Sequence, residues 1–257
     1  MDQKLTKVSI VIPVYNEALA ISEVLRRVCL APLGPDAVKE VIIVDDGSID
    51  STLRCIEEFL GAHPEYKSII KIHTGLINHG KGAALRAGFK LATGDVIIVQ
   101  DGDLEYSPQD YPILLKPFQD PRVNVVYGSR FVYGFPEGMR VLNRIANVIL
   151  TLATRILYAQ KITDEATGYK VFRRSVLQGI ELSCLEFEFC PEFTSKVLRA
   201  GLQIIEVPIS YNPRGILEGK KIRARDGFIA LWWLIKFRFA ASSTFLNAPA
   251  LQLKREP

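Results

Sequence analysis

The chain has 257 residues, with 32 Lys and Arg against 28 Asp and Glu, so its formal net charge is +4. This length allows one large α/β domain, and the mild positive excess suits acidic small molecules or anionic lipid headgroups better than nucleic acid. The four cysteines lack metal-finger spacing, so we expect reduced thiols in a cytosolic protein and no zinc site. The first apolar run is too short for a signal peptide. The sequence contains no stretch of about 20 apolar residues, so no membrane span is predicted.

Apolar stretches and helical patterns alternate through the first hundred residues. Strands are predicted at residues 8–14, 41–44, 69–73 and 96–99, with helices at 18–30, 51–60 and 83–92 between them. This alternation predicts a doubly wound, mostly parallel sheet with right-handed crossovers. Ligands bind at the carboxyl edge of such a sheet, where the polar loops 13–17, 45–48, 78–82 and 101–105 should lie.

Three acidic residues follow the strand predicted at 96–99. Asp101, Asp103 and Glu105 alternate, so in extended backbone their carboxylates leave on one face and should converge on a hard cation such as Mg²⁺ or Mn²⁺. A turn with solvated acids is the alternative, and the position after a buried strand favours the metal site. No G-x-G-x-x-G follows the first strand and no P-loop is present, which argues against a dinucleotide-binding enzyme.

The second half is less regular. Strands are predicted at 124–127 and 204–211, and a polar turn at 164–168 precedes residues 169–172. A helix at 140–157 carries Arg140 and Arg144 one turn apart, as a phosphate site or an ordinary solvated face. Glu186 and Glu188 are candidate general bases, although a capped helix starting at Pro191 explains their acidity equally well.

A basic stretch at 214–225 is followed by an apolar and aromatic stretch at 227–241, GFIALWWLIKFRFAA. The latter predicts either an amphipathic helix lying in a membrane interface or a helix packed on the core. We therefore expect a catalytic domain over 1–226, and a helix with a polar tail over 227–257 that contacts a membrane surface.

Seven motifs, in order along the chain, resemble glycosyltransferase family 2, and within it the polyprenyl-phosphate sugar transferases of the dolichol-phosphate mannose synthase type. They are VSIVIPVYNE at 8–17, EVIIVDDGSIDST at 40–52, NHGKGAALRAGF at 78–89, VQDGDLEY at 99–106, GSRF at 128–131, DEATGYKVFRR at 164–174 and VPISYNPRGILEGKKI at 207–222. The resemblance implies a GT-A fold, a nucleotide-sugar donor, Mg²⁺ or Mn²⁺, and inversion at the anomeric carbon.

The resemblance also implies roles for individual residues. Catalytic roles fall to Asp103, Arg130 and Asp164, and metal binding falls to Asp101, Asp103 and Glu105. A UDP- or GDP-hexose donor would contact Pro13, Tyr15, Glu17, Val44, Asp46, Lys81, Asp101, Gly102 and Asp103. A dolichyl or undecaprenyl phosphate acceptor would contact Arg130, Arg140, Arg144, Arg214 and Lys220.

Three functional hypotheses follow from these residues. A phosphate acceptor is already largely anionic near neutral pH and needs positioning rather than deprotonation. A saccharide hydroxyl acceptor would instead need a carboxylate base, for which Asp164, Glu186 and Glu188 are the candidates. A nucleotide-binding protein without transferase activity is disfavoured because both Asp101 and Asp103 are present. For transfer to a lipid, we expect peripheral attachment at the cytoplasmic face of a membrane.

Overall fold

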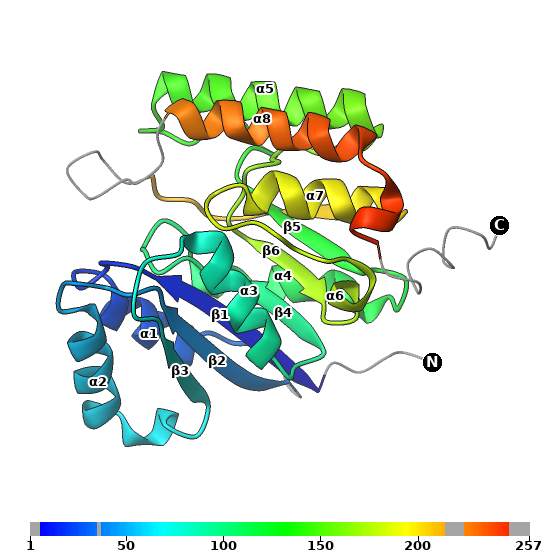
Figure 1. The fold of residues 1–257 in the computed structure, drawn as a ribbon. Helices are drawn as coiled ribbons and strands as arrows, with labels where there is room; N and C mark the ends of the chain where they lie inside the picture. Colours follow the sequence, from blue (N-terminus) through cyan, green and yellow to red (C-terminus); the bar gives the residue numbers. More distant parts are fainter. Residues whose placement is uncertain (1–5, 35–36, 214–223, 247–257) are drawn as a thin grey trace.

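The computed structural model describes residues 6–34, 37–213 and 224–246, and in this part of the chain seven strands form one sheet. The strand order is β3-β2-β1-β4-β6-β5-β7 (Figure 1). The strands are β1 (Lys7–Val14), β2 (Val38–Asp45), β3 (Ile70–Thr74), β4 (Val96–Val99), β5 (Val125–Ser129), β6 (Lys170–Arg173) and β7 (Ile204–Pro208). The predicted doubly wound, mostly parallel sheet is confirmed, with boundaries that differ from the prediction by a few residues.

Strand β6 is the exception to the parallel arrangement. It pairs antiparallel with both β4 and β5, whereas β1 pairs parallel with β2 and β4. Because β6 runs in the opposite direction, its amino end lies at the edge where the parallel strands end. The turn at 163–169 before β6 therefore joins the predicted ligand edge, although no local pattern predicts this reversal.

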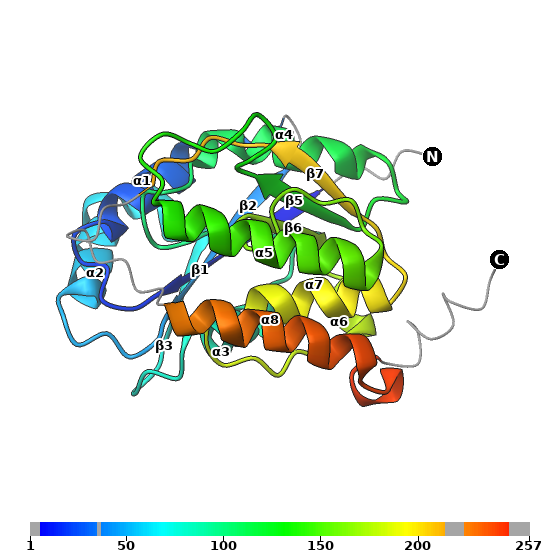
Figure 2. The ribbon, with the colours of Figure 1, turned by 90° about the horizontal axis from the view of Figure 1, so that it is seen from above.

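Helices cover both faces of the sheet. Side chains of α1 (Ile21–Leu30), α2 (Thr52–Ala62) and α4 (Tyr111–Leu115) share one buried cluster with Ile10 and Ile12 of β1. Side chains of α3 (Lys81–Leu91) and α7 (Phe189–Arg199) share the other with Val11. The short helix α6 (Val176–Gly179) follows β6, whereas α5 (Val141–Tyr158) and α8 (Ala224–Phe239) lie side by side beyond α7 as an outer layer (Figures 1 and 2).

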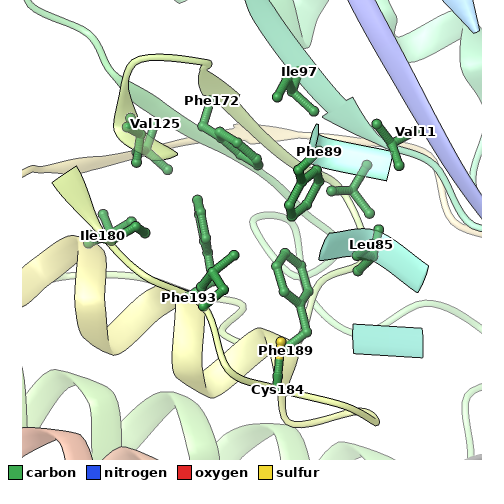
Figure 3. Close-up of a cluster of buried hydrophobic side chains, with 14 of the residues drawn as sticks. Val11, Leu85, Phe89, Ile97, Val125, Phe172, Ile180, Cys184, Phe189 and Phe193 are labelled. Carbon is green, nitrogen blue, oxygen red and sulfur yellow. The ribbon is translucent and has the colours of Figure 1, made fainter. Parts of the chain in front are cut away.

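Aromatic side chains join the two halves of the sequence in the cluster beneath α3 and α7 (Figure 3). The ring centroid of Phe172 lies 5.4 Å from that of Phe89 in α3 and 4.7 Å from that of Phe193 in α7. Edge-to-face and tilted pairs of this kind contribute about 1 kcal/mol each beyond the area they bury. The packing holds α3 against β6 and α7.

Helix α8 belongs to the same packed body. It begins at Ala224, so the domain boundary predicted between 226 and 227 lies inside it. The side chains of Ala230, Leu234 and Phe237 are buried, and the Arg199 guanidinium donates hydrogen bonds to carbonyls at the carboxyl end of α8. The side chains of Phe228, Trp232 and Phe239 are exposed. The helix therefore both packs on the core and presents aromatic residues outward.

Helix α5 departs from the expectation that no segment could span a membrane. It is 18 residues long, and among the described residues it alone has the length and composition to cross a bilayer. Its buried side chains include Asn147, Thr151 and Thr154, which face the protein. Seven apolar side chains on its other side are between 48% and 72% exposed: Val141, Leu142, Ile145, Val148, Ile149, Leu152 and Ile156.

Candidate active site

Loops at the carboxyl edge of β1 and β2 are tied together by hydrogen bonds. Asn16 has a φ of 51°, a conformation that Asn tolerates better than most residues. Its main-chain N–H donates to Ser48 Oγ at 2.9 Å, and its Oδ1 accepts the N–H of Ile49 at 2.9 Å. These bonds fix the loop after β1 against the loop after β2.

Asp46 organises the glycine-rich loop. Its two carboxylate oxygens accept the main-chain N–H groups of His79 at 3.0 Å and Gly80 at 2.7 Å. Gly80 has a φ of 100°, which only glycine adopts readily. Asp46 therefore holds the loop that leads into α3 as well as facing the ligand site.

These loops surround a cavity of about 470 Å³, a size that suits a small ligand. Val44, which the resemblance assigned to the donor, is instead buried in the core and lies against Gly88 of α3. Eight of the nine residues predicted to contact the donor line the cavity: Pro13, Tyr15, Glu17, Asp46, Lys81, Asp101, Gly102 and Asp103.

The second half of the chain supplies another part of the cavity wall. Glu186 and Phe187 lie before α7, and Arg225 and Asp226 lie in the first turn of α8. Glu186 was predicted only as a base, and Phe187, Arg225 and Asp226 were not predicted as donor contacts. No local motif marks these residues, because long-range packing brings them to the cavity.

Asp101, Asp103 and Glu105 all line the cavity, and each has a partner within the protein. Asp101 forms an ion pair with Lys81, Asp103 Oδ1 accepts the N–H of Glu105 at 2.9 Å, and Glu105 Oε2 accepts the hydroxyl of Tyr211 at 3.0 Å. Among the described residues, no three acidic, His or Cys side chains are grouped as a metal site. The chain turns after Val99, so the strand alternation from which the convergence was predicted does not continue through 101–105, and cation binding by these residues stays a prediction.

The ion pair between Lys81 and Asp101 leaves a charged group at the cavity. Burial opposes the charge on Lys81, but the neighbouring Asp101 carboxylate outweighs it and raises the pKa of the lysine. A fully charged ammonium therefore lies beside the carboxylates. The oxygen-rich set of side chains suits Mg²⁺ or Mn²⁺ better than a softer metal.

Gly168 allows the turn before β6 to approach the aspartate loop. A Cβ atom at this position would lie 2.6 Å from Asp101 Oδ2 and 2.9 Å from the ring of Tyr106. The Gly168 N–H also donates to the Tyr106 hydroxyl at 2.8 Å. The reversed strand β6 thus brings the motif at 164–174 into contact with the motif at 99–106.

Arg130 is held at the end of β5 by a buried carboxylate. Its Nε and Nη2 atoms each lie 2.7 Å from an oxygen of Asp164, and Nη2 also donates to Asn147 Oδ1 of α5 at 3.1 Å. The guanidinium carbon lies 5.0 Å from the ring centroid of Tyr211. Glu206 accepts the N–H groups of Thr163 and Asp164, which fixes the turn that carries Asp164.

The other predicted acceptor residues have different surroundings. Arg144 donates to the carbonyls of Met139 at 3.0 Å and Pro136 at 3.3 Å, so it closes the turn before α5. Arg140 is exposed at the amino end of that helix. Arg214 and Lys220 lie outside the described residues.

A second cavity, of about 270 Å³, lies beside Arg130. Its lining is mostly apolar or aromatic and includes Val132, Phe135, Ile209 and Tyr211. A cation next to an apolar surface suits a ligand that carries an anionic group on a hydrocarbon chain.

Two of the three candidate bases are engaged in the structure. Both oxygens of Asp164 bind Arg130, and Glu188 Oε1 accepts the N–H of Leu185 at 2.9 Å. Glu186 lines the cavity of about 470 Å³. Asp164 and Glu188 therefore orient neighbouring groups, and Glu186 is the candidate that faces a ligand.

The sequence profile of Glycosyl transferase family 2 matches residues 9–180. The chain belongs to this family. Among its relatives, the polyprenol monophosphomannose synthase of Mycolicibacterium smegmatis is 30% identical over 238 residues, covering 87% of this chain and 85% of that protein. The dolichol-phosphate mannosyltransferase of Pyrococcus furiosus is 29% identical over 219 residues, covering 83% of this chain and 59% of that protein.

This family 2 member spans about three fifths of the length of the Pyrococcus protein and of a dodecaprenyl-phosphate galacturonate synthase from Rhizobium johnstonii. Its fold matches a Mycobacterium tuberculosis glucosyl-3-phosphoglycerate synthase, whose structure contains Mn²⁺, UDP and phosphoglyceric acid. The TM-score is 0.68 at 20% identity, over 93% of this chain and 80% of that one. The predicted family and GT-A fold are confirmed.

Proposed function

We propose that this family 2 glycosyltransferase moves a hexose, with inversion, from a UDP- or GDP-sugar to a polyprenyl phosphate at the cytoplasmic surface of a membrane. The observation that carries the proposal is the position of Arg130. The Arg130 guanidinium contacts the ring of Tyr211 and donates a hydrogen bond to Asn147 of α5. The Tyr211 hydroxyl donates to Glu105, which lines the cavity of about 470 Å³, the proposed donor cavity. Arg130 thus lies between the donor cavity and the helix with an exposed apolar face.

The donor cavity has the charges that a nucleoside diphosphate requires. Asp101 and Asp103 would hold Mg²⁺ or Mn²⁺, and the cation when bound neutralises charge on the leaving diphosphate. The Lys81 ammonium adds a fixed positive charge beside them. Solved structures with this fold contain Mn²⁺ or Mg²⁺ together with UDP, which supports this assignment.

The acceptor side suits an anionic nucleophile. A phosphate monoester has a second pKa of about 6, so its oxygen is largely anionic at neutral pH and needs orientation rather than a base. Arg130 can orient it, and Asp164 in turn fixes the guanidinium through two hydrogen bonds. The names of the Mycolicibacterium and Pyrococcus relatives describe transfer involving lipid phosphates, which agrees with this chemistry.

The outer layer of α5 and α8 suits a membrane surface. In α5, polar side chains such as Asn147 and Thr151 face the protein and apolar ones face outward, and α8 exposes Trp232, as in helices that lie in the interface plane. Lys236 and Arg238 are exposed near the end of α8, where they can attract anionic lipids. This surface would bring the enzyme to an acceptor that is itself in the bilayer.

Transfer to a saccharide hydroxyl is the second candidate, because Glu186 lines the donor cavity as a base would. The test supplies purified protein with a panel of radiolabelled nucleotide sugars, Mn²⁺ and a short polyprenyl phosphate. We expect the label of one sugar to enter the organic phase, and chelation of the cation to stop it. Label that moves only to a soluble saccharide would replace the proposed acceptor.

A further inference from the structure

The segment at 182–188 covers the amino end of α3. The carbonyl oxygens of Leu185 and Glu186 accept the N–H groups of Ala83 at 2.9 Å and Gly82 at 3.0 Å. The first amides of a helix commonly bind an anion when they are free. Here these amides donate to carbonyl oxygens of the protein itself and so attach this segment to the first half of the chain.

Two glycines let the main chains touch. A Cβ atom at Gly80 would lie 2.5 Å from the carbonyl oxygen of Leu185, and one at Gly82 would lie 2.9 Å from that of Glu186. Any larger residue would push the segment away. The glycine-rich motif at 78–89 therefore serves as the docking surface for 182–188.

Buried charges anchor the same segment from α7. The Glu192 carboxylate, fully buried, accepts the N–H groups of Ser183 and Cys184 at 2.8 Å each, and it pairs with Lys196 at 2.5 Å. Glu188 bonds the N–H of Leu185 at 2.9 Å. The backbone on both sides of Glu186 is thus held firmly against the rest of the protein.

We propose that Glu186 and Phe187 form the wall of the donor cavity that recognises the hexose. The inference rests on the proposed function, in which a nucleotide sugar occupies the cavity and Asp101 and Asp103 lie at its diphosphate. The family resemblance assigns the loop at 13–17 and Asp46 to the donor as well, which leaves them for the nucleoside. Glu186 and Phe187 line the same cavity from the other half of the chain, where the hexose remains to be bound.

The two side chains have the chemistry that a sugar requires. A carboxylate accepts hydrogen bonds from two adjacent hydroxyl groups, and their directions distinguish one hexose from its epimers. The face of an aromatic ring packs against the apolar C–H groups of the sugar ring. In this assignment Glu186 is a specificity residue, and it does not remove a proton from the acceptor.

Direct binding tests the assignment without an acceptor. Calorimetry with Mn²⁺ would compare nucleotide sugars with their nucleoside diphosphates on wild type, Glu186→Ala and Phe187→Ala. We expect the preferred nucleotide sugar to bind about tenfold more weakly to each variant, because Glu186→Ala loses a hydrogen bond to a charged group and Phe187→Ala loses the packing of a ring on the sugar. Binding of the nucleoside diphosphate should change less than about twofold. Glu181→Ala, at an exposed acid immediately before this segment, should match wild type.

Glu186→Gln separates recognition from base catalysis. We expect it to weaken sugar binding and to alter the preference among epimers. Unchanged binding of the nucleotide sugar, with a large loss of kcat, would identify a base and overturn the assignment. Equal weakening of the nucleotide sugar and the diphosphate would also overturn it. If the binding pattern holds but wild type transfers nothing to a polyprenyl phosphate, the assignment stands and the acceptor proposal falls.

Discussion

Two regions of the molecule differ at their surfaces: the first half of the chain, which supplies most of the proposed donor cavity (the donor half), and the second half, which carries Arg130, α5 and α8 (the acceptor half). In the donor half, buried polar groups such as Asp46 and Glu40 have several hydrogen-bond partners within the protein. In the acceptor half, α5 and α8 leave large apolar side chains exposed. In the first region these buried polar groups are hydrogen-bonded within the protein, whereas the second region presents an apolar surface that suits contact with a membrane. Four changes test this contrast.

The largest effect is expected in the donor half. Asp103→Asn removes one charge from the group that would hold the cation, so transfer should fall about a thousandfold or more. The radiolabel assay measures the loss, and circular dichroism should show an unchanged fold. Near-normal turnover would refute the assignment of Asp103 to the metal.

Arg130→Lys tests the connection between the halves. Lysine cannot bond both oxygens of Asp164 and also Asn147, so kcat/KM for the polyprenyl phosphate should fall about a hundredfold. Binding of the nucleotide sugar should change by less than about twofold. Arg122→Lys is the matched control, because Arg122 pairs with Asp120 on the surface. A similar loss in both variants would refute a specific role for Arg130.

The membrane surface is tested by adding charge to its two helices. The double change Leu152→Glu and Trp232→Glu should weaken binding to anionic liposomes about a hundredfold, since each apolar side chain contributes roughly 1.5 kcal/mol or more when buried. Flotation measures the bound fraction. Leu30→Glu, at an exposed position of α1, should bind normally. Wild-type protein that stays entirely in the soluble fraction would contradict membrane attachment.

The smallest effect concerns stability in the donor half. Burial raises the pKa of Glu40, but hydrogen bonds from Ser9 and Lys71 and from the N–H of Thr93 outweigh it and hold the pKa well below its usual value. Glu40→Gln should lower the free energy of unfolding by about 2 kcal/mol at pH 7, because a neutral amide cannot form ion pairs with Lys7 and Lys71. The loss is no larger because both lysines remain partly exposed to water.

The pH dependence of this change follows from the direction of the shift. A carboxylate with a lowered folded pKa stabilises the protein above its unfolded pKa of about 4.3, and this stabilisation is lost as the pH falls below that value. Urea unfolding of wild type and Glu40→Gln should therefore converge in acid. A constant difference from pH 7 to pH 3 would show that the charge of Glu40 is not responsible.

The order of strands and helices, the carboxyl edge of the sheet and most of the cavity lining could be predicted from the sequence. These features depend on local alternation of apolar residues and on short motifs whose loops follow consecutive strands. The antiparallel direction of β6, the different partners of the three carboxylates and the docking of 182–188 on α3 became visible in three dimensions. These outcomes depend on packing between residues far apart in the chain, and no local pattern encodes it. The same packing decided which apolar side chains of α5 and α8 are buried and which remain exposed.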